Sequence, residues 1–331
     1  MRRRPGRTAS PPRITGRFCM PTEKLIYVAS IGRSGSTLLE AILGAHSAVA
    51  TAGEVHIWPH ELREDRRPCA CGLPVSQCPF WVDVAARVRP ADQRPPLLDH
   101  FREHHNAGHT IRPRMLAQFR RDRPVEGELA AAIERYGRNS ADFFRAFRAV
   151  HAERCGTEVT WVVDASKDPY RLLWLKRSGL FDLRVLHVTR DPAAFVYSAT
   201  RPQIELGRRA TLHRLGKTAR QTGAWVAQNV LFDRLARNVL ADGEHLHVRY
   251  EELATDPHST FRRICDFVGI DDEPAAVERF REGSVHTIAG NPMRYSSRPI
   301  ELDRRWEAGL PRSSRLIAGV VSAPLRGRFG Y

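Results

Sequence analysis

The stretch that decides the fold is KLIYVASIGRSGSTLLEAILGA, residues 24–45. Leu25–Ala29 is a short apolar run with β-branched and aromatic side chains, which predicts a buried strand. Ser30–Gly35 supplies turn residues, and the apolar positions after Ser36 follow one face of a helix. A strand, a glycine-containing turn and a helix in this order direct several backbone N–H groups toward one place. The stretch therefore predicts an anion site suited to phosphate.

The turn differs from the Walker A loop of nucleoside triphosphatases. When it is aligned with that motif, Ser30 stands at the first glycine and Ser36 at the lysine, and only Gly35 and Thr37 fit. The lysine that contacts the β- and γ-phosphates is therefore missing, while a cation stands at Arg33. The loop thus predicts a phosphate-bearing nucleotide other than an ordinary triphosphate. The alternative is a plain turn that closes a βα unit and binds nothing.

Composition narrows the class of protein. The 331 residues, 42% of them hydrophobic and 8% aromatic, allow one large α/β domain or two small ones. The net charge of +15 suits a polyanionic partner, or else reflects an arginine-rich surface without a function. The sequence lacks zinc-finger spacing, RNP motifs and aromatic-interleaved basic stripes, so we expect no nucleic-acid partner. No apolar run approaches the roughly 20 residues of a membrane span.

The composition of the N-terminus predicts a basic tail. Its first twenty residues hold six arginines and no acidic residue, and they lack the apolar centre of a secretory signal. Residues 1–22 are predicted to be a disordered basic tail, and residues 23–331 the folded domain. With no export signal, we expect a cytoplasmic protein.

Three of the six cysteines, Cys69, Cys71 and Cys78, lie close together, whereas Cys19, Cys155 and Cys265 are scattered. The three could bind zinc with a fourth ligand such as His60, although their spacing lacks the usual two-pair pattern. We favour a reduced structural loop, with zinc or a disulfide as alternatives. A dense disulfide framework is not expected inside a cell.

Apolar runs predict four more strands, at Val49–Glu54, Val159–Val163, Leu183–Val188 and His245–Val248. Helices are predicted to begin near Pro169 and Pro192 and to cover Leu212–Leu240, Phe261–Val268 and one stretch near Arg304–Gly319. Strands that alternate with helices favour an α/β fold in which helices flank both faces of a parallel sheet.

The charged region Val82–Ala152 interrupts this alternation. It is mostly helical in pattern, with prolines at 95, 96, 113 and 124 separating the helices and Ile133–Val150 as the clearest amphipathic piece. We interpret the region as a helical insertion that packs over the sheet edge and shapes the acceptor region.

Residues suited to chemistry follow four predicted strands. The first strand leads to Arg33 and its anion loop, the second to Glu54 and the third to Lys167. The fourth leads to Arg190, with Ser198 eight residues later in a helix. Ligands of parallel sheets bind beyond the carboxyl ends of the strands. If these ends are neighbours, the cleft would bind a nucleotide with two separated anionic groups and place a general base beside it.

In this order and spacing, these residues resemble the PAPS-dependent sulfotransferase family, PAPS being 3′-phosphoadenosine-5′-phosphosulfate. Arg33–Leu38 resembles the family's 5′-phosphosulfate loop, and Thr189–Pro192 with Ser198 resembles its 3′-phosphate motif. Further similar segments are Asp164–Lys167, Val248–Leu253 and Gly290–Arg294. The resemblance extends from Lys24 to Tyr331, and Val82–Ala152 is its least recognisable part.

The resemblance implies a P-loop-like domain that moves a sulfuryl group from PAPS, its co-substrate, to a hydroxyl or an amine without requiring a metal. The implied donor-binding residues are Arg33, Ser34, Gly35, Ser36 and Thr37 around the 5′-phosphate, Arg190 and Ser198 around the 3′-phosphate, and Tyr250, Asn291 and Arg294 beside the nucleotide. Arg33 and Lys167 would stabilise the leaving oxygen.

Glu54 is the implied general base, with His56 as the alternative. The acceptor, a small molecule or a carbohydrate, and the oligomeric state stay open. Two rival functions also remain. One is a kinase or NTPase with a degenerate loop, which the serine at position 36 disfavours. The other is a non-catalytic basic protein that binds nucleic acid or anionic surfaces through its tail and the 82–152 region.

Overall fold

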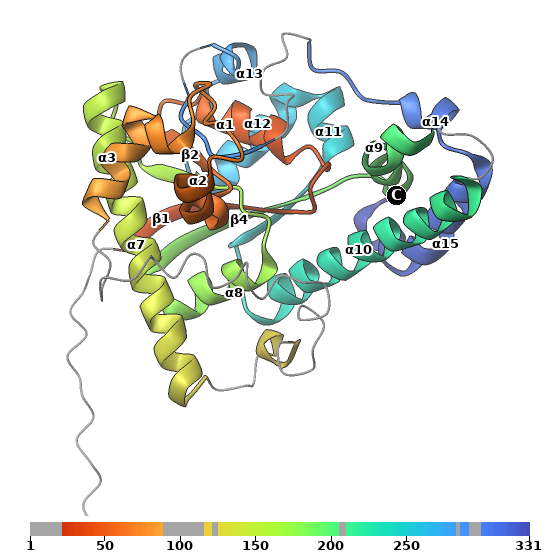
Figure 1. Ribbon diagram of the computed structural model, residues 1–331, viewed down its shortest axis with the longest axis horizontal. Helices are drawn as coiled ribbons and strands as arrows, with labels where there is room; N and C mark the ends of the chain where they lie inside the picture. The colour runs from red at the N-terminus through yellow and green to blue at the C-terminus, as the bar shows by residue number, and fades with distance from the viewer. Residues whose placement is uncertain (1–21, 89–115, 121–124, 205–209, 283–284, 291–298) are drawn as a thin grey trace, which may run out of the picture.

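A parallel sheet of five strands lies at the centre of the computed structural model (Figure 1). The structure describes residues 22–88, 116–120, 125–204, 210–282, 285–290 and 299–331. The strands are β1 (Glu23–Ser30), β2 (Val49–Gly53), β3 (Trp161–Asp164), β4 (Phe181–Thr189) and β5 (His245–Arg249). Their order is β2-β3-β1-β4-β5, and every neighbouring pair is parallel. All five predicted strands are confirmed, and all five carboxyl ends lie at the same edge.

Both faces of the sheet are covered, which explains the unbroken apolar run of β1. Leu25 and Tyr27 belong to one buried cluster, and Ile26 and Val28 to the other, because successive side chains of a strand point to opposite faces. The first cluster includes residues of α2 (Trp58–Glu64), α3 (Pro79–Arg87), α7 (Gly127–Cys155) and α8 (Pro169–Ser178). The second includes residues of α1 (Ser36–Gly44), α11 (Tyr250–Thr255), α12 (Pro257–Val268) and α13 (Ala275–Arg279).

Helix α7 corrects one prediction about the insertion. Its residues Phe143 and Phe147 pack in the same cluster as Leu25 of the central strand, and Arg148 donates to the Lys24 carbonyl at 2.6 Å. The helix therefore packs on a face of the sheet rather than over its edge, because its phenylalanines bury themselves against β1 and β4. The four prolines predicted to break the insertion lie outside the described residues, as does the predicted N-terminal tail up to residue 21.

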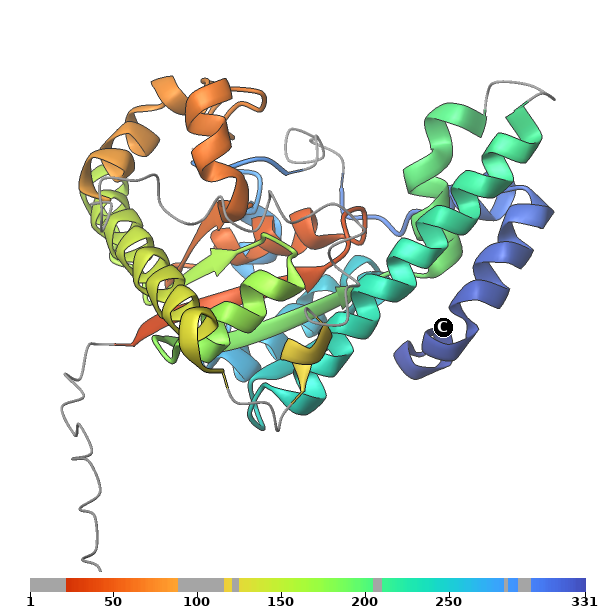
Figure 2. The ribbon, with the colours of Figure 1, turned by 60° about the horizontal axis from the view of Figure 1, so that its bottom comes forward.

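A third cluster extends beyond the sheet, where α9 (Pro192–Ile204) and α10 (Ala210–Asn238) pack with α15 (Arg312–Arg326), as Figure 2 shows. The single helix predicted near residues 304–319 is two helices, α14 (Arg305–Gly309) and α15. Pro311 explains the break, because the residue before a proline is disfavoured in helical conformation, and Leu310 is extended. Short 3-10 turns are η1 (Val55–Ile57), η2 (Val75–Gln77), η4 (Ala117–Phe119) and η6 (Gly327–Phe329). In the described ranges, the search for a helix long and apolar enough to cross a membrane found none.

Candidate active site

The predicted anion loop connects β1 to α1 and contains two residues with a positive φ. Gly35 has φ 89° and precedes the helix, where its carbonyl accepts from the Leu38 amide at 3.0 Å. Arg33 also has a positive φ, 74°, and its side chain is exposed. The Ser34 hydroxyl is fully buried, yet within the described part of the chain it has no hydrogen-bond partner. A buried hydroxyl in this state costs about 1–3 kcal/mol, which an oxygen of a bound anion would recover.

Tyr250 packs against this loop from the start of α11. A Cβ atom added to Gly35 would lie only 2.4 Å from Cδ2 of the Tyr250 ring, so glycine is required both for its φ and for this close approach. The same ring lies 4.5 Å from the guanidinium carbon of Arg190. Tyr250 therefore connects the anion loop to the end of β4.

We expect Gly35→Ala to lower the free energy of unfolding by about 1–3 kcal/mol and to weaken binding of the nucleotide that the sequence predicts for this loop, because the new methyl group displaces Tyr250 and strains the backbone. Denaturant unfolding and a binding titration measure the two effects. Gly32→Ala is the matched control, since a Cβ at Gly32 meets nothing within 4 Å. Equal stability of the two variants would contradict the prediction.

Arg190 lies beside the loop, and not all of the N–H donors of its guanidinium have partners among the described residues. Its side chain is almost completely buried, and Nη1 donates to the Arg33 carbonyl at 3.2 Å. Nη2 forms an ion pair with Asp303 at 3.4 Å, while Nε has no hydrogen-bond partner among the described residues. Hydrogen bonds from Arg305 and the charge of Arg190 hold the pKa of Asp303 well below its usual range. Any anion bound by Arg190 must therefore compete with an ionised carboxylate.

A helix begins directly after Arg190, as the sequence predicted near Pro192. The Asp191 carboxylate accepts from the amides of Ala193 and Ala194, at 2.8 and 3.1 Å, and so caps α9. Ser198 lies farther along this helix and is partly buried. Within the described residues, its hydroxyl makes no polar contact with the other predicted site residues.

The ends of β2 and β3 meet in an ion pair. Lys167 Nζ donates to Glu54 Oε1 at 2.8 Å, and the two side chains are 11% and 23% exposed. The Glu54 amide donates to the Ile288 carbonyl at 2.9 Å, which fixes the backbone just after β2. His56 follows in η1, and its amide donates to Ser166 Oγ at 3.1 Å. The two predicted catalytic residues that follow β2 and β3 are thus brought together.

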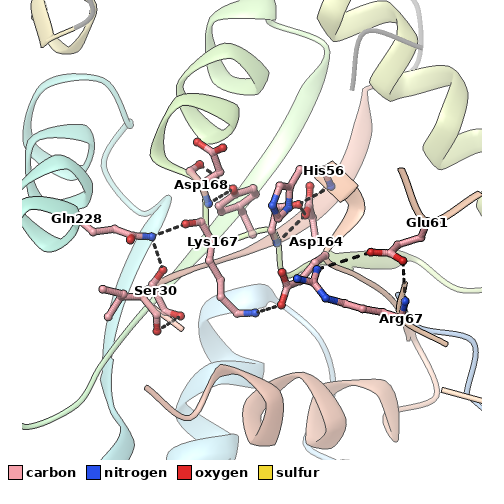
Figure 3. A network of polar contacts seen from close by, with 12 residues as sticks. Ser30, His56, Glu61, Arg67, Asp164, Lys167, Asp168 and Gln228 are labelled. Carbon is pink, nitrogen blue, oxygen red and sulfur yellow. Dashed lines mark hydrogen bonds and ion pairs between the residues drawn. The ribbon is translucent and has the colours of Figure 1, made fainter. Parts of the chain in front are cut away.

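Buried contacts hold Lys167 in place. Its φ of 59° is left-handed, which is uncommon for a residue with a Cβ. On one side of it, Asp164 accepts from Arg171 Nε at 2.7 Å, and both side chains are completely buried. On the other side, the Tyr27 hydroxyl donates to the Asp168 carbonyl at 2.7 Å and accepts from the Asp168 amide at 2.9 Å. These anchors fix the loop around Lys167 (Figure 3).

Gln228 of α10 connects the segment that leads to the anion loop with the segment that carries Lys167. Its Nε2 donates to the carbonyl of Ser30 at 2.9 Å and to that of Lys167 at 2.6 Å, as Figure 3 shows. The bridge links the end of β1 to the end of β3. Sequence analysis missed Gln228, because a single glutamine in a long helix carries no spacing signal.

The remaining predictions concern the residues after Gly290 and the clustered cysteines. Asn291 and Arg294 lie outside the described residues. The three clustered cysteines do come together with a histidine, but it is His286 and not His60. His60 instead lies near Arg63, 3.4 Å from its guanidinium, so its choice as the fourth ligand is wrong.

Comparison with known proteins gives a consistent picture. A model of the sulfotransferase family matches residues 82–274, more than half of the chain. This range includes the insertion that we expected to be least recognisable, and it leaves the anion loop outside. Carbohydrate sulfotransferase 2 from Homo sapiens is 30% identical over 129 residues, which cover 29% of this chain and 24% of that protein. The Mus musculus protein of the same name matches equally, so the match spans about a quarter of the length of these relatives.

Solved structures share the fold over most of the chain. The sulfotransferase domain of the Synechococcus PCC 7002 olefin synthase has a TM-score of 0.50 and 19% identity, covering 91% of this chain and 95% of that domain. Sulfotransferase STF9 from Mycobacterium avium has a TM-score of 0.50 and 15% identity, covering 94% of this chain and 78% of that one. These likenesses confirm the predicted P-loop-like α/β fold.

Proposed function

The chain belongs to the sulfotransferase family, and on that premise we propose that it transfers a sulfuryl group from PAPS to a hydroxyl or amine of an acceptor. The observation that carries the choice of donor is a pair of unsatisfied buried groups on neighbouring strand ends. Ser34 Oγ and Arg190 Nε both lack hydrogen-bond partners among the described residues, and the Arg33 carbonyl and the Tyr250 ring connect them. A nucleotide with a phosphate at each end would satisfy both.

The donor residues follow from this placement. Ser34–Thr37, at the N-terminus of α1, would bind the 5′-phosphate through amides and hydroxyls. Arg190 would bind the 3′-phosphate, with Ser198 as a second donor. Tyr250 would flank the nucleotide, and we retain Asn291 and Arg294 for this role from the family resemblance.

Glu54 and Lys167 would carry the chemistry. As the acceptor oxygen forms its bond to sulfur, its proton passes to the Glu54 carboxylate. The bond between sulfur and the bridging oxygen of the 5′-phosphate breaks, and its electron pair stays on that oxygen. Lys167 and Arg33 would stabilise the charge that develops there, leaving a sulfated acceptor and adenosine 3′,5′-bisphosphate. Because Lys167 Nζ lies 2.8 Å from Glu54, the two members of one ion pair would act on the attacking oxygen and on the leaving oxygen.

A carbohydrate hydroxyl is the acceptor class that we propose. The support is the name of the curated relatives, carbohydrate sulfotransferase 2, together with the net positive charge, which suits an acidic sugar. Membership of the sulfotransferase family favours sulfuryl transfer over the two rival functions, a kinase or NTPase and a non-catalytic basic binding protein. We retain the cytoplasmic location and the absence of a nucleic-acid partner as proposals.

Ligand-dependent melting tests the donor. We expect adenosine 3′,5′-bisphosphate and PAPS to raise the melting temperature by several degrees, since saturation at 100 times Kd adds about 2.7 kcal/mol. Adenosine 5′-phosphate, which lacks the 3′-phosphate, should shift the melting temperature less, and ATP with Mg²⁺ should not exceed PAPS. No shift with either 3′-phosphorylated nucleotide, or a larger shift with ATP and Mg²⁺, would contradict the proposal.

A further inference from the structure

Three cysteines and one histidine converge at a place separate from the proposed active-site residues. Cys69, Cys71, Cys78 and His286 each offer one ligand atom, and these four atoms all lie within 4.8 Å of one another. The cysteines come from the loop between α2 and α3, whereas His286 comes from a segment more than 200 residues later. The sulfuryl transfer proposed above uses none of them.

The measured separations match a tetrahedral zinc centre. The sulfurs of Cys71 and Cys78 are 3.7 Å apart, and Nδ1 of His286 lies 3.3 Å from Cys78 Sγ and 3.8 Å from Cys69 Sγ. Bond lengths of about 2.3 Å to sulfur and 2.0 Å to nitrogen place tetrahedral ligands about 3.8 Å apart for two sulfurs and about 3.5 Å apart for sulfur and nitrogen. Only the widest separations must contract for one ion to bind all four atoms.

The surroundings favour a closed site. Cys69 and Cys78 are completely buried, and Cys71 is partly exposed. The imidazole of His286 stacks on Phe80 with 4.8 Å between ring centroids and 5° between planes, which fixes its orientation.

We propose that Cys69, Cys71, Cys78 and His286 bind one structural zinc ion. Three thiolates and one imidazole are a ligand set that structural zinc uses, and soft thiolates disfavour magnesium and calcium. Because all four positions are filled by protein, the ion has no open position for substrate, and its role is to hold chain segments together.

The segments that zinc would join support the active site. Cys69 forms an antiparallel bridge with Ile288, and Gly53 at the end of β2 forms a parallel bridge with the same residue. The Ala70 amide donates to the Thr287 carbonyl at 3.1 Å, and the Ile288 carbonyl accepts from the Glu54 amide at 2.9 Å. Zinc would therefore fasten the loop after α2 to the segment that supports Glu54. A cross-link between residues so distant in sequence restricts the unfolded chain strongly.

Metal analysis of the full-length protein tests the proposal. The protein is purified under reducing conditions without chelator, desalted and measured by plasma mass spectrometry. We expect about one zinc per chain, and we expect Cys71→Ser and His286→Ala to lose most of it. Cys155→Ser, which changes an exposed cysteine outside the group, is the matched control and should keep the metal.

Cobalt substitution of the wild-type chain keeps the test informative if a variant does not fold. After zinc is removed with a chelator, we expect the melting temperature to fall by several degrees. Added Co²⁺ should then produce the charge-transfer absorption of thiolate ligands with tetrahedral d–d bands. Less than a tenth of a zinc per chain without cobalt absorption would overturn the proposal. A Cys71–Cys78 disulfide in peptide mass spectra of the purified chain would also overturn it.

Discussion

Glu54→Gln is expected to lower turnover by about 10²–10⁴-fold, the range associated with loss of a positioned general base. Glutamine keeps the shape of the side chain and an oxygen that can accept from Lys167 Nζ. The hydrogen bond of 2.8 Å between Lys167 and Glu54 can therefore form without the negative charge. Affinity for adenosine 3′,5′-bisphosphate should stay within a few-fold of the wild type, because Glu54 is not among the proposed phosphate ligands. Single-turnover transfer of labelled sulfate and a calorimetric titration measure these two quantities.

Two further variants make the result specific. Glu64→Gln changes an acidic residue at the end of α2 that pairs with Arg66 near the surface, and it should leave turnover unchanged. His56→Ala separates the two candidate bases. Loss of turnover in His56→Ala together with full turnover in Glu54→Gln would assign the base to His56 and would falsify the role given to Glu54.

Arg190→Ala is expected to weaken binding of adenosine 3′,5′-bisphosphate by about 10²–10⁴-fold. The estimate corresponds to the loss of about two charge-assisted hydrogen bonds of about 1.5–3 kcal/mol each. The variant also removes one of the two arginines that pair with Asp303, so that only Arg305 offsets the negative charge of this carboxylate near the phosphate. Calorimetric titration of the wild type and the variant measures the difference.

The sharper readout is the ratio of affinities for nucleotides with and without a 3′-phosphate. If Arg190 binds that group, the ratio collapses in Arg190→Ala, while affinity for adenosine 5′-phosphate changes little. Arg184→Ala is the matched control, since Arg184 lies within β4, away from the carboxyl end that Arg190 follows, and pairs with Asp182 at 2.8 Å. An unchanged ratio in Arg190→Ala would show that another residue binds the 3′-phosphate.

The elements of the fold were predictable because their signals are local. The apolar run of β1 and the Asp191-Pro192 start of α9 each act within a few residues of sequence. The break between α14 and α15 also had a local signal in Pro311, which the sequence analysis overlooked. The face covered by α7 could not be predicted, because periodicity shows that a helix has an apolar side but not which surface it contacts.

The site was predictable only as far as parallel strands determine it. The sequence placed Glu54 and Lys167 at strand ends, and the order of the strands, in which β2 and β3 are neighbours, brings the two side chains together. Gln228 reaches Ser30 across 198 positions of sequence, and His286 reaches Cys78 across 208. Asp303 likewise contacts Arg190 from a distant segment. Contacts between such distant residues depend on how whole helices and loops pack, and no spacing rule in a single sequence reports it.

The left-handed backbone of Lys167 limits how this position can change during evolution or engineering. Glycine, and to a lesser degree asparagine, adopts its φ of 59° with less strain, but neither carries the amine that contacts Glu54. Arginine keeps a positive charge and keeps the strain. A stabilisation campaign that selects only for melting temperature would therefore favour replacements here that remove the amine to which we assign a role in transfer. Under that proposal, selection for thermal stability and selection for turnover favour different residues at position 167.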